Sequence, residues 1–275
     1  MSNINIAYKS LADRLALGDQ LKYRADGLWF KENRLGYEGA AEYLASEILK
    51  YSNISNFVTY DMVTRRRDGR EIRACMSPDF MLNYPSNVKL TTIFDLFNNL
   101  GHFDWDQETA NMSVKEKILF TVRQTELLTG LTNVGPYLTQ VLEFDALIRN
   151  EDRHLRNIAL ICHPMQYEFA PLFDNGAAFM SDVRGLPPEY EMGKLVRALQ
   201  SKPFSVSFEE QVEVCRSLYG PQLQISPEMD LSDAFWRIET EYSPLVAERM
   251  QAALNLGKSL HPDFFNGNLA VIRFA

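Results

Sequence analysis

The chain has 275 residues, 46% of them hydrophobic, with a formal net charge of −8 at pH 7 and an isoelectric point near 5.1. This acidic balance argues against general nucleic-acid binding, which depends on neutralising many phosphates, and the short apolar runs argue against a membrane span. The first ten residues, MSNINIAYKS, lack the basic start and apolar stretch of a signal peptide, and the three cysteines form no CxxC pair. We therefore expect a cytoplasmic protein without a disulfide framework.

The first 77 residues favour strands with one helix. Short strand candidates at 21–23 and 28–31 flank the turn sequence 24–27, and apolar residues at helical spacing predict a helix over 36–50. Two further strand candidates, 57–64 and 71–76, flank the hairpin signal Asp68-Gly69. Five arginines surround that turn, at positions 65, 66, 67, 70 and 73. They are typical of a solvated hairpin tip, with docking of an acidic partner as the alternative.

The rest of the chain favours helices. Ser113 with Glu116 is a capping box, and the same device recurs at Ser207 with Glu210. These signals, together with Ser243-Pro244 and later glycines as stops, predict helices ending at Gly130, Gly220 and Gly257. Strands with one helix followed by a helical half predict an α+β chain of two lobes, residues 1–77 and 78–275.

The stretch 142–178 has the order that phosphoryl transfer from ATP requires. A helical run leads into a polar loop with Asp152 and Asn157, and two apolar strand candidates, 158–162 and 167–173, end in an exposed Asp174. A kinase needs one carboxylate for the acceptor hydroxyl and further oxygen ligands for magnesium. An Asp and an Asn on one tight loop can face a common cleft, and the later acid can close the metal site.

The sequence D-R-H-x-x-N at 152–157, followed by the apolar hairpin and P-L-F-D-N-G at 171–176, resembles HipA-like serine/threonine kinases. It is also similar to the D-R-H-x-x-N and D-F-G pair of phosphatidylinositol 3- and 4-kinases, which share the wider fold. The chain's size, the preceding helix and the run 170–174 favour the HipA-like side. The resemblance implies a bilobal protein-kinase-like fold, with a small strand-rich N-terminal lobe and a larger helical C-terminal lobe.

Carried over to this sequence, the resemblance implies that Asp152 is the catalytic aspartate and that Asn157 and Asp174 bind Mg²⁺. His154 also matches the motif and would either stabilise charge on the transferred phosphoryl group or brace the loop. Asn175 stands where D-F-G has phenylalanine, so the switching tied to that aromatic need not apply. The structural alternative is a surface ion pair of Asp152 with Arg153.

A kinase-like site also needs a strand lysine paired with a helix glutamate. Lys31 ends an apolar strand, and the resemblance to the HipA-like pattern, in which a W-x-K strand precedes a Glu-bearing helix, implies this role for it. Among the helix glutamates we choose Glu42, one turn after Glu38, and we place adenine near 74–77, including Met76. The chain has no G-x-x-x-x-G-K-[ST], so the phosphate-covering turn is expected at 17–20 or 25–27.

These residues predict a magnesium- and ATP-dependent phosphotransferase, and the HipA-like resemblance implies a serine/threonine protein kinase, a transferase acting on a protein acceptor and capable of autophosphorylation. The alternatives are a lipid or small-molecule kinase, a catalytically inactive pseudokinase that binds a partner, and a metallohydrolase using Asp152, His154 and Asp174. HipA-like proteins act as toxins held by a partner, so the resemblance implies that an antitoxin-like protein could bind this chain. We expect no membrane or nucleic-acid partner.

Overall fold

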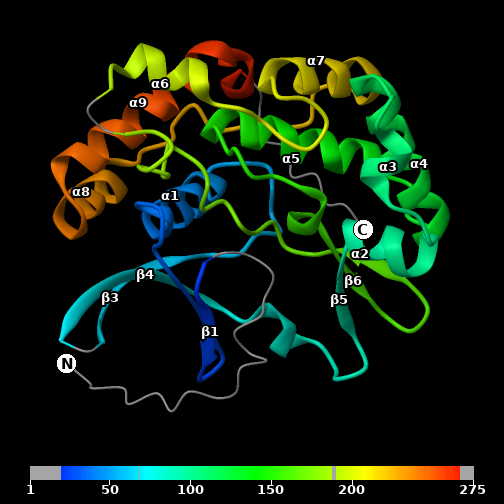
Figure 1. The fold of residues 1–275 in the computed structure, drawn as a ribbon, viewed down its shortest axis with the longest axis horizontal. Coiled ribbons are helices and arrows are strands. Elements are labelled where there is room, and N and C mark those ends of the chain that lie inside the picture. The colour runs from blue at the N-terminus through cyan, green and yellow to red at the C-terminus, as the bar shows by residue number, and fades with distance from the viewer. Residues whose placement is uncertain (1–19, 68, 188–189, 267–275) are drawn as a thin grey trace.

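The computed structural model describes residues 20–67, 69–187 and 190–266. A small antiparallel sheet lies on one side of the molecule, a larger set of helices on the other, and helix α1 (Glu38–Leu49) between them (Figure 1). Across the described residues, no helix is long and apolar enough to cross a membrane. The division into lobes at residue 77 stays a prediction.

The small sheet has the order β1-β2-β4-β3, formed by β1 (Lys22–Ala25), β2 (Leu28–Glu32), β4 (Arg70–Pro78) and β3 (Asp61–Arg67). The β1–β2 turn is shorter than the expected 24–27 because Asp26 and Gly27 both have positive φ, which allows a two-residue hairpin loop. Strand β3 begins later than the expected residue 57. Val58 instead donates its amide to the Leu172 carbonyl, at 2.9 Å.

The helical part contains short and long helices: α2 (Ile93–Leu96), η3 (Phe97–Gly101), α3 (Trp105–Thr109), α4 (Val114–Thr129), α5 (Val134–Ile148), α6 (Met192–Ala198), α7 (Phe208–Tyr219), α8 (Ser232–Glu241) and α9 (Pro244–Leu260). The described residues also include the 3-10 turns η2 (Phe80–Asn83) after β4, η4 (Leu155–Asn157) after α5 and η5 (Pro262–Phe265) after α9. Helix α5 is buried on every side, so the run before the catalytic loop is a central core helix. Helices α7 and α9 pack against it.

The predicted helix signals agree with the structure to different degrees. The capping box at Ser113 and Glu116 is present and Gly130 ends α4, as predicted. Ser207 caps α7, but the Glu210 carboxylate bonds the Ser205 hydroxyl instead of returning to the cap. Helix α9 continues three residues past Gly257, to Leu260. That glycine serves close packing instead, because a Cβ there would lie 1.9 Å from the Leu147 carbonyl oxygen of α5.

A second sheet has the order β5-β6-β7, with β5 (Lys89–Thr92), β6 (Ala159–Cys162) and β7 (Tyr167–Phe169), and its last two strands connect the segment of Asp152 to that of Asp174. Strand β7 is shorter than the expected 167–173, because the chain then leaves β6 and Leu172 pairs with residues 56–58. One hydrophobic core runs from α1 through α5 to α9, with Leu44, Phe144 and Met250 among its buried members. Helix α1 is therefore fixed to the helical part as well as to the sheet.

Candidate active site

Lys31 lies at the centre of the candidate site. Its Nζ is 2.5 Å from Oε1 of Glu42 on α1 and 2.8 Å from Oδ1 of Asp174 after β7. Two other glutamates of the same helix are engaged elsewhere, since Glu38 accepts bonds from the backbone just before α1 and Glu47 pairs with Lys50. Of the three candidates, Glu42 is thus the one that the fold brings to Lys31.

Lys31 and Asp174 hold each other in the ionised state. Burial would lower the pKa of Lys31, but the Asp174 and Glu42 carboxylates outweigh it and raise that pKa well above its ordinary value. Burial likewise favours a protonated Asp174, yet the ammonium groups of Lys31 and Lys22 dominate and lower its pKa. Burial raises the pKa of Glu42, opposed by the Lys31 ammonium and the Asn175 amide. At neutral pH Lys31 is therefore a cation facing the Asp174 carboxylate.

Asp174 differs from the expected exposed acid at a strand end. Its side chain is 20% exposed and lies between two lysines, because Lys22 of β1 places its Nζ 3.6 Å from the second carboxylate oxygen. The residue also has φ 63°, a left-handed conformation that is uncommon for a side chain other than glycine and is enriched at functional sites. No sequence signal pointed to Lys22, since a lysine at a strand start is usually solvated.

The loop after α5 folds tightly around Asp152. The Asp152 carbonyl accepts bonds from the His154 amide and from Nδ2 of Asn157, both at 2.9 Å, and the Asn157 amide bonds the His154 carbonyl at 2.8 Å. The Asn157 side chain thus supports the loop through Nδ2, and its Oδ1 is the atom that the prediction assigns to magnesium. The Asp152 carboxylate points outward and is half-exposed. It accepts a bond from Nζ of Lys202 at 2.7 Å and lies 3.6 Å from Nε2 of His154.

Arg153 joins this loop to the segment that carries Asp174. Its guanidinium is fully buried, and Nε and Nη2 bind the Asp145 carboxylate of α5 at 2.8 and 3.0 Å. Nη1 donates to the Asn157 carbonyl at 3.1 Å and to the Phe173 carbonyl at 2.7 Å, next to Asp174. The alternative of a surface ion pair between Asp152 and Arg153 is wrong, because the partner is Asp145. The sequence signal for this pair was Asp145, a charged residue within the apolar run of α5.

Asn175 links the same cluster to α1. Its backbone amide donates to Oε2 of Glu42 at 2.8 Å, and its side-chain Oδ1 accepts from Arg153 at 2.6 Å. In this fold the position after Asp174 is thus a buried polar bridge, where D-F-G has an aromatic ring. Glu42 consequently contacts both Lys31 and the backbone beside Asp174.

The segments predicted to contact adenine and to cover the phosphates do not lie directly beside the Lys31 side chain. In the β2–β4 register Lys31 pairs with Cys75 and Met76 with Phe30, so the Met76 side chain lies on the opposite face of the sheet. The turn at 25–27 lies at the far end of β2, about 10 Å along the strand from Lys31. The alternative phosphate turn, 17–20, falls almost entirely outside the described residues.

The donor atoms suit a magnesium ion held together with phosphates. Mg²⁺ prefers oxygen ligands and is usually bound by one or two carboxylates plus substrate phosphates, and Asp174 and Asn157 offer a carboxylate and an amide oxygen. Arg153 fixes the backbone next to each of them. Within the part of the chain that is described, no three His, Cys, Asp or Glu side chains gather to hold a metal by themselves.

We compared the chain with protein families, with curated proteins and with solved structures, and similarity was found among the solved structures. No protein-family model matches the sequence, and no curated protein matches it either. Among solved structures, the proinflammatory kinase CtkA of Helicobacter pylori has a TM-score of 0.55 at 15% identity, over 87% of this chain and 90% of that one. HipA of Shewanella oneidensis, solved with HipB and operator DNA, has a TM-score of 0.50 at 13% identity, over 98% of this chain and 70% of that one.

These likenesses concern the fold. The chain has the mixed α+β, kinase-like architecture of CtkA and HipA, which confirms the fold class predicted from the sequence and the resemblance to HipA-like kinases at the level of the fold. The roles of individual site residues remain predictions.

Proposed function

We propose that this protein is a magnesium-dependent serine/threonine protein kinase of the HipA-like kind, which transfers the γ-phosphoryl group of ATP. The observation that carries the proposal is the contact of Lys31 with both Glu42 and Asp174, at 2.5 and 2.8 Å. Kinases use this strand lysine, helix glutamate and metal-binding aspartate to hold the nucleotide. The kinase-like neighbours support the same reading.

Each residue has a role that follows from its surroundings. Asp152, exposed on the catalytic loop, orients the acceptor hydroxyl and takes its proton. Lys31 contacts the phosphates, and Glu42 holds its ammonium in place. Asn157 and Asp174 hold magnesium, which when bound neutralises phosphate charge and aligns the γ-phosphoryl group. Burial lowers the pKa of His154, which disfavours the cationic form, so this residue braces the loop through its backbone bonds to Asp152 and Asn157 instead of supplying a cation.

The proposal also includes a partner and a location. The HipA neighbour belongs to a toxin–antitoxin system with HipB, and by analogy an antitoxin-like protein could bind this chain. Autophosphorylation, a cytoplasmic location and an adenine contact at Met76 are part of the same proposal.

The test is direct phosphorylation. Purified protein with Mg²⁺ and γ-labelled ATP should label itself or a protein mixture, and Asp152→Ala or Asp174→Ala should abolish the label. Calorimetry should show that the wild type binds Mg-ATP and that Asp152→Ala still does, because Asp152 faces the acceptor. Absence of Mg-ATP binding by the wild type would contradict the proposal and leave a pseudokinase.

A further inference from the structure

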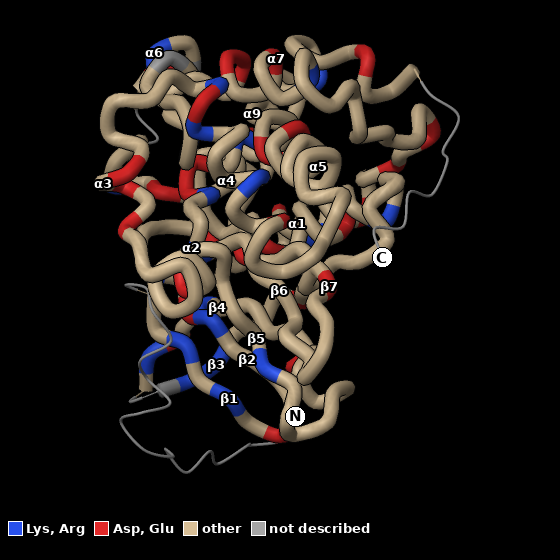
Figure 2. Tube along the Cα trace, turned by 90° about the vertical axis from the view of Figure 1, so that its right-hand side faces the viewer, with Lys and Arg blue, Asp and Glu red and all other residues tan. Residues whose placement is uncertain are grey.

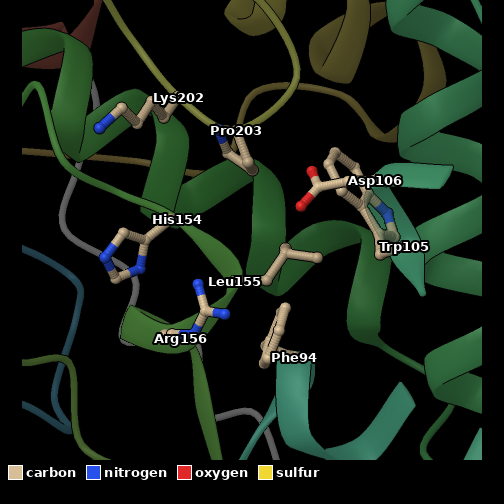
Figure 3. Close-up of a pocket in the computed structure, with 8 residues that line it drawn as sticks. All are labelled: Phe94, Trp105, Asp106, His154, Leu155, Arg156, Lys202 and Pro203. Carbon is tan, nitrogen blue, oxygen red and sulfur yellow. The ribbon is translucent and has the colours of Figure 1, made fainter. Parts of the chain in front are cut away.

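A cavity of about 150 Å³ opens beside the catalytic loop, away from the nucleotide residues. His154, Leu155 and Arg156 form one side, and Lys202 and Pro203 form another (Figure 3). Neither Lys31 nor Asp174 contributes to its lining. The cavity thus shares the catalytic loop with the nucleotide site but lies on another side of it.

Lys202 connects this cavity to Asp152. Its ammonium bonds the Asp152 carboxylate at 2.7 Å, and both side chains are about half exposed, at 54% and 46%. Exposed ion pairs contribute little to stability, so an incoming hydroxyl can replace this contact at small cost. The buried Nδ1 of His154, which also lines the cavity, has no hydrogen-bond partner among the described residues. A group bound here would therefore lie beside Lys202, the residue that now holds the Asp152 carboxylate.

The deeper walls are apolar and fixed before any ligand arrives. Trp105 is buried and its indole N–H donates to the Thr121 hydroxyl at 2.8 Å, while Leu155 is 4% exposed. The ring of Phe94 lies under the Arg156 guanidinium, at 3.5 Å from ring centroid to guanidinium carbon. Preformed apolar pockets with a few polar groups at the edge are the usual form of a ligand site, and a cavity of this size holds a six-membered ring.

We propose that this cavity is the acceptor subsite, and that it takes the large aliphatic or aromatic side chain next to the phosphorylated serine or threonine of a protein substrate. The proposal rests on the kinase function proposed above and names its substrate class. A peptide seated with that side chain against Trp105 and Leu155 brings the neighbouring hydroxyl to the Asp152 carboxylate, where Lys202 now binds.

The chemical step then balances within the proposed reaction. The acceptor oxygen forms a bond to the γ-phosphorus of ATP, and the bond from that phosphorus to the bridging oxygen of ADP breaks. The hydroxyl proton passes to the Asp152 carboxylate. The products are a phosphorylated side chain and ADP, and no further reactant is needed.

The charge of the cavity favours a peptide over an inositol lipid. Phosphoinositide headgroups are bound by clusters of several Lys and Arg side chains. Here the rim carries two cations, Lys202 and Arg156, and Lys202 is already paired with Asp152. Asp106 adds an acid that would repel a phosphorylated headgroup; its carboxylate points towards the cavity in Figure 3.

The experiment uses short peptides with a single serine, whose neighbour on either side is alanine, leucine, phenylalanine, glutamate or lysine. We expect kcat/KM for the best leucine or phenylalanine peptide to exceed that of its alanine counterpart by at least about tenfold. Asp106→Phe should fill the cavity from an exposed position and reduce this preference below about twofold, with the alanine peptide unaffected. Glu108→Phe, an exposed acid on the same helix that does not line the cavity, is the matched control and should keep the preference.

Calorimetry without nucleotide gives a second readout, in which the wild type and Glu108→Phe bind the leucine or phenylalanine peptide more tightly than Asp106→Phe does. Equal rates for all flanking residues, a preference that survives Asp106→Phe, or labelling of phosphatidylinositol vesicles but of no peptide would each overturn the acceptor subsite. Slow hydrolysis of Mg-ATP without peptide, lost in Asp174→Asn, reports the kinase function separately. If the wild type neither binds nor hydrolyses Mg-ATP, the kinase proposal itself has failed.

Discussion

Lys31 shows how one buried charge can organise a site. Two acidic and two lysine side chains meet there, from Glu42, Asp174, Lys31 and Lys22, and each acid lies against at least one lysine. Buried charges are tolerated when they are paired and hydrogen-bonded, and removing one partner leaves another uncompensated. Replacing the lysine would therefore place the two acids together without a cation between them.

Lys31→Met should consequently lose both stability and activity. We expect the free energy of unfolding to fall by about 3 kcal/mol, as for other broken buried ion pairs, and phosphorylation to drop at least about 100-fold. Adding Glu42→Gln removes one of the unpaired acids, so the double variant should recover part of the stability but none of the activity. Urea unfolding and kinase assays check both effects. A double variant no more stable than the single one would contradict this account.

Glu151, beside the catalytic aspartate, should make stability depend on pH. Burial raises its pKa to about 6, and the hydrogen bond from the Gln200 amide opposes this only in part. The folded state therefore holds this proton more tightly than the unfolded state, so the contribution of Glu151 is most favourable below pH 4.5 and is lost as pH rises to 6. Allowing for solvent screening, the loss is about 1 kcal/mol.

The comparison is between wild type and Glu151→Gln, unfolded by urea at several pH values between 4.5 and 7. As pH rises, the free energy of unfolding of the wild type should fall relative to that of Glu151→Gln. If the two free energies change with pH in parallel, the assignment to Glu151 is wrong. Other titrating groups are common to both proteins and cancel.

At the scale of single residues, the sequence predicts those that belong to an ordered motif. Asp152, Asn157 and Asp174 have recognisable spacing and neighbours, whereas Arg153 does not reveal its role. From the sequence alone, Arg153 is expected to form a surface ion pair with its neighbour Asp152. The fold instead brings Asp145 of α5 against its guanidinium. Lys22 and Lys202 were missed for a similar reason, since each acquires its function only from distant partners.

Among the elements, α1 has the largest effect on the candidate site, because it positions Glu42 against Lys31. Its start is tied to the segment after Asp174, where the Tyr37 hydroxyl donates to the Met180 carbonyl at 2.7 Å, and Arg249 of α9 donates to that hydroxyl at 3.2 Å. Asn33 adds a second tie, since its Nδ2 donates to the Tyr242 hydroxyl at 3.0 Å. The helix is thus held by contacts with the C-terminal helices.

Asn33→Ala should loosen this attachment. The variant loses the bonds to Tyr242 and to the Gly36 carbonyl, as well as the acceptor for the Gly39 amide in the first turn of α1. We expect a loss of about 1–2 kcal/mol in unfolding free energy and a fall of more than tenfold in phosphorylation rate, because Glu42 lies one turn further along.

Asn98→Ala is the matched control, because it also removes a side-chain bond to a backbone carbonyl, that of Phe94 at 2.8 Å, but on η3. It should lower stability and leave the rate near that of the wild type. A similar loss of rate in both variants would mean that general destabilisation, and not the position of α1, is responsible.

Elements with local signals were predicted best. Helix α4 has its capping box and glycine stop within its own sequence, and these alone define it. Strand β5 has no comparable signal, because its partner β6 follows far along the chain and only tertiary contact makes residues 89–92 extended. Strand β7 ends early for the same kind of reason, since Leu172 pairs with a segment from the first part of the protein.

Over the whole molecule, charge is distributed unevenly. The chain is acidic, yet Lys and Arg gather on β1, β3 and β4 (Figure 2). The arginine cluster there is only partly a solvated tip, as the sequence suggested. Arg66 is mostly exposed, but Arg65 is half-buried, with its guanidinium 4.3 Å from the ring centroid of Phe30. The electrostatic potential of these strands therefore favours a polyanionic ligand on this side of the molecule.

Because Lys31 and Glu42 come from the first part of the chain, and Asn157 and Asp174 from the second, a ligand that contacts all four should stabilise the molecule as one unit. The continuous core from α1 to α9 predicts a single unfolding transition that shifts as a whole. At a Mg-ATP concentration 100 times its Kd, the gain is about 2.7 kcal/mol, which raises Tm by about 5 °C for a chain of this size. Thermal unfolding followed by circular dichroism measures this.

Asp174→Asn should reduce the shift to near zero, since it removes the metal-binding carboxylate that faces Lys31, while Asp106→Asn, an exposed aspartate on α3, should keep it. ATP with a chelator should shift Tm less than Mg-ATP, because the carboxylate then faces the phosphates with no cation between them. Two separate transitions, of which only one responds to Mg-ATP, would show that the two parts of the chain do not form one cooperative site.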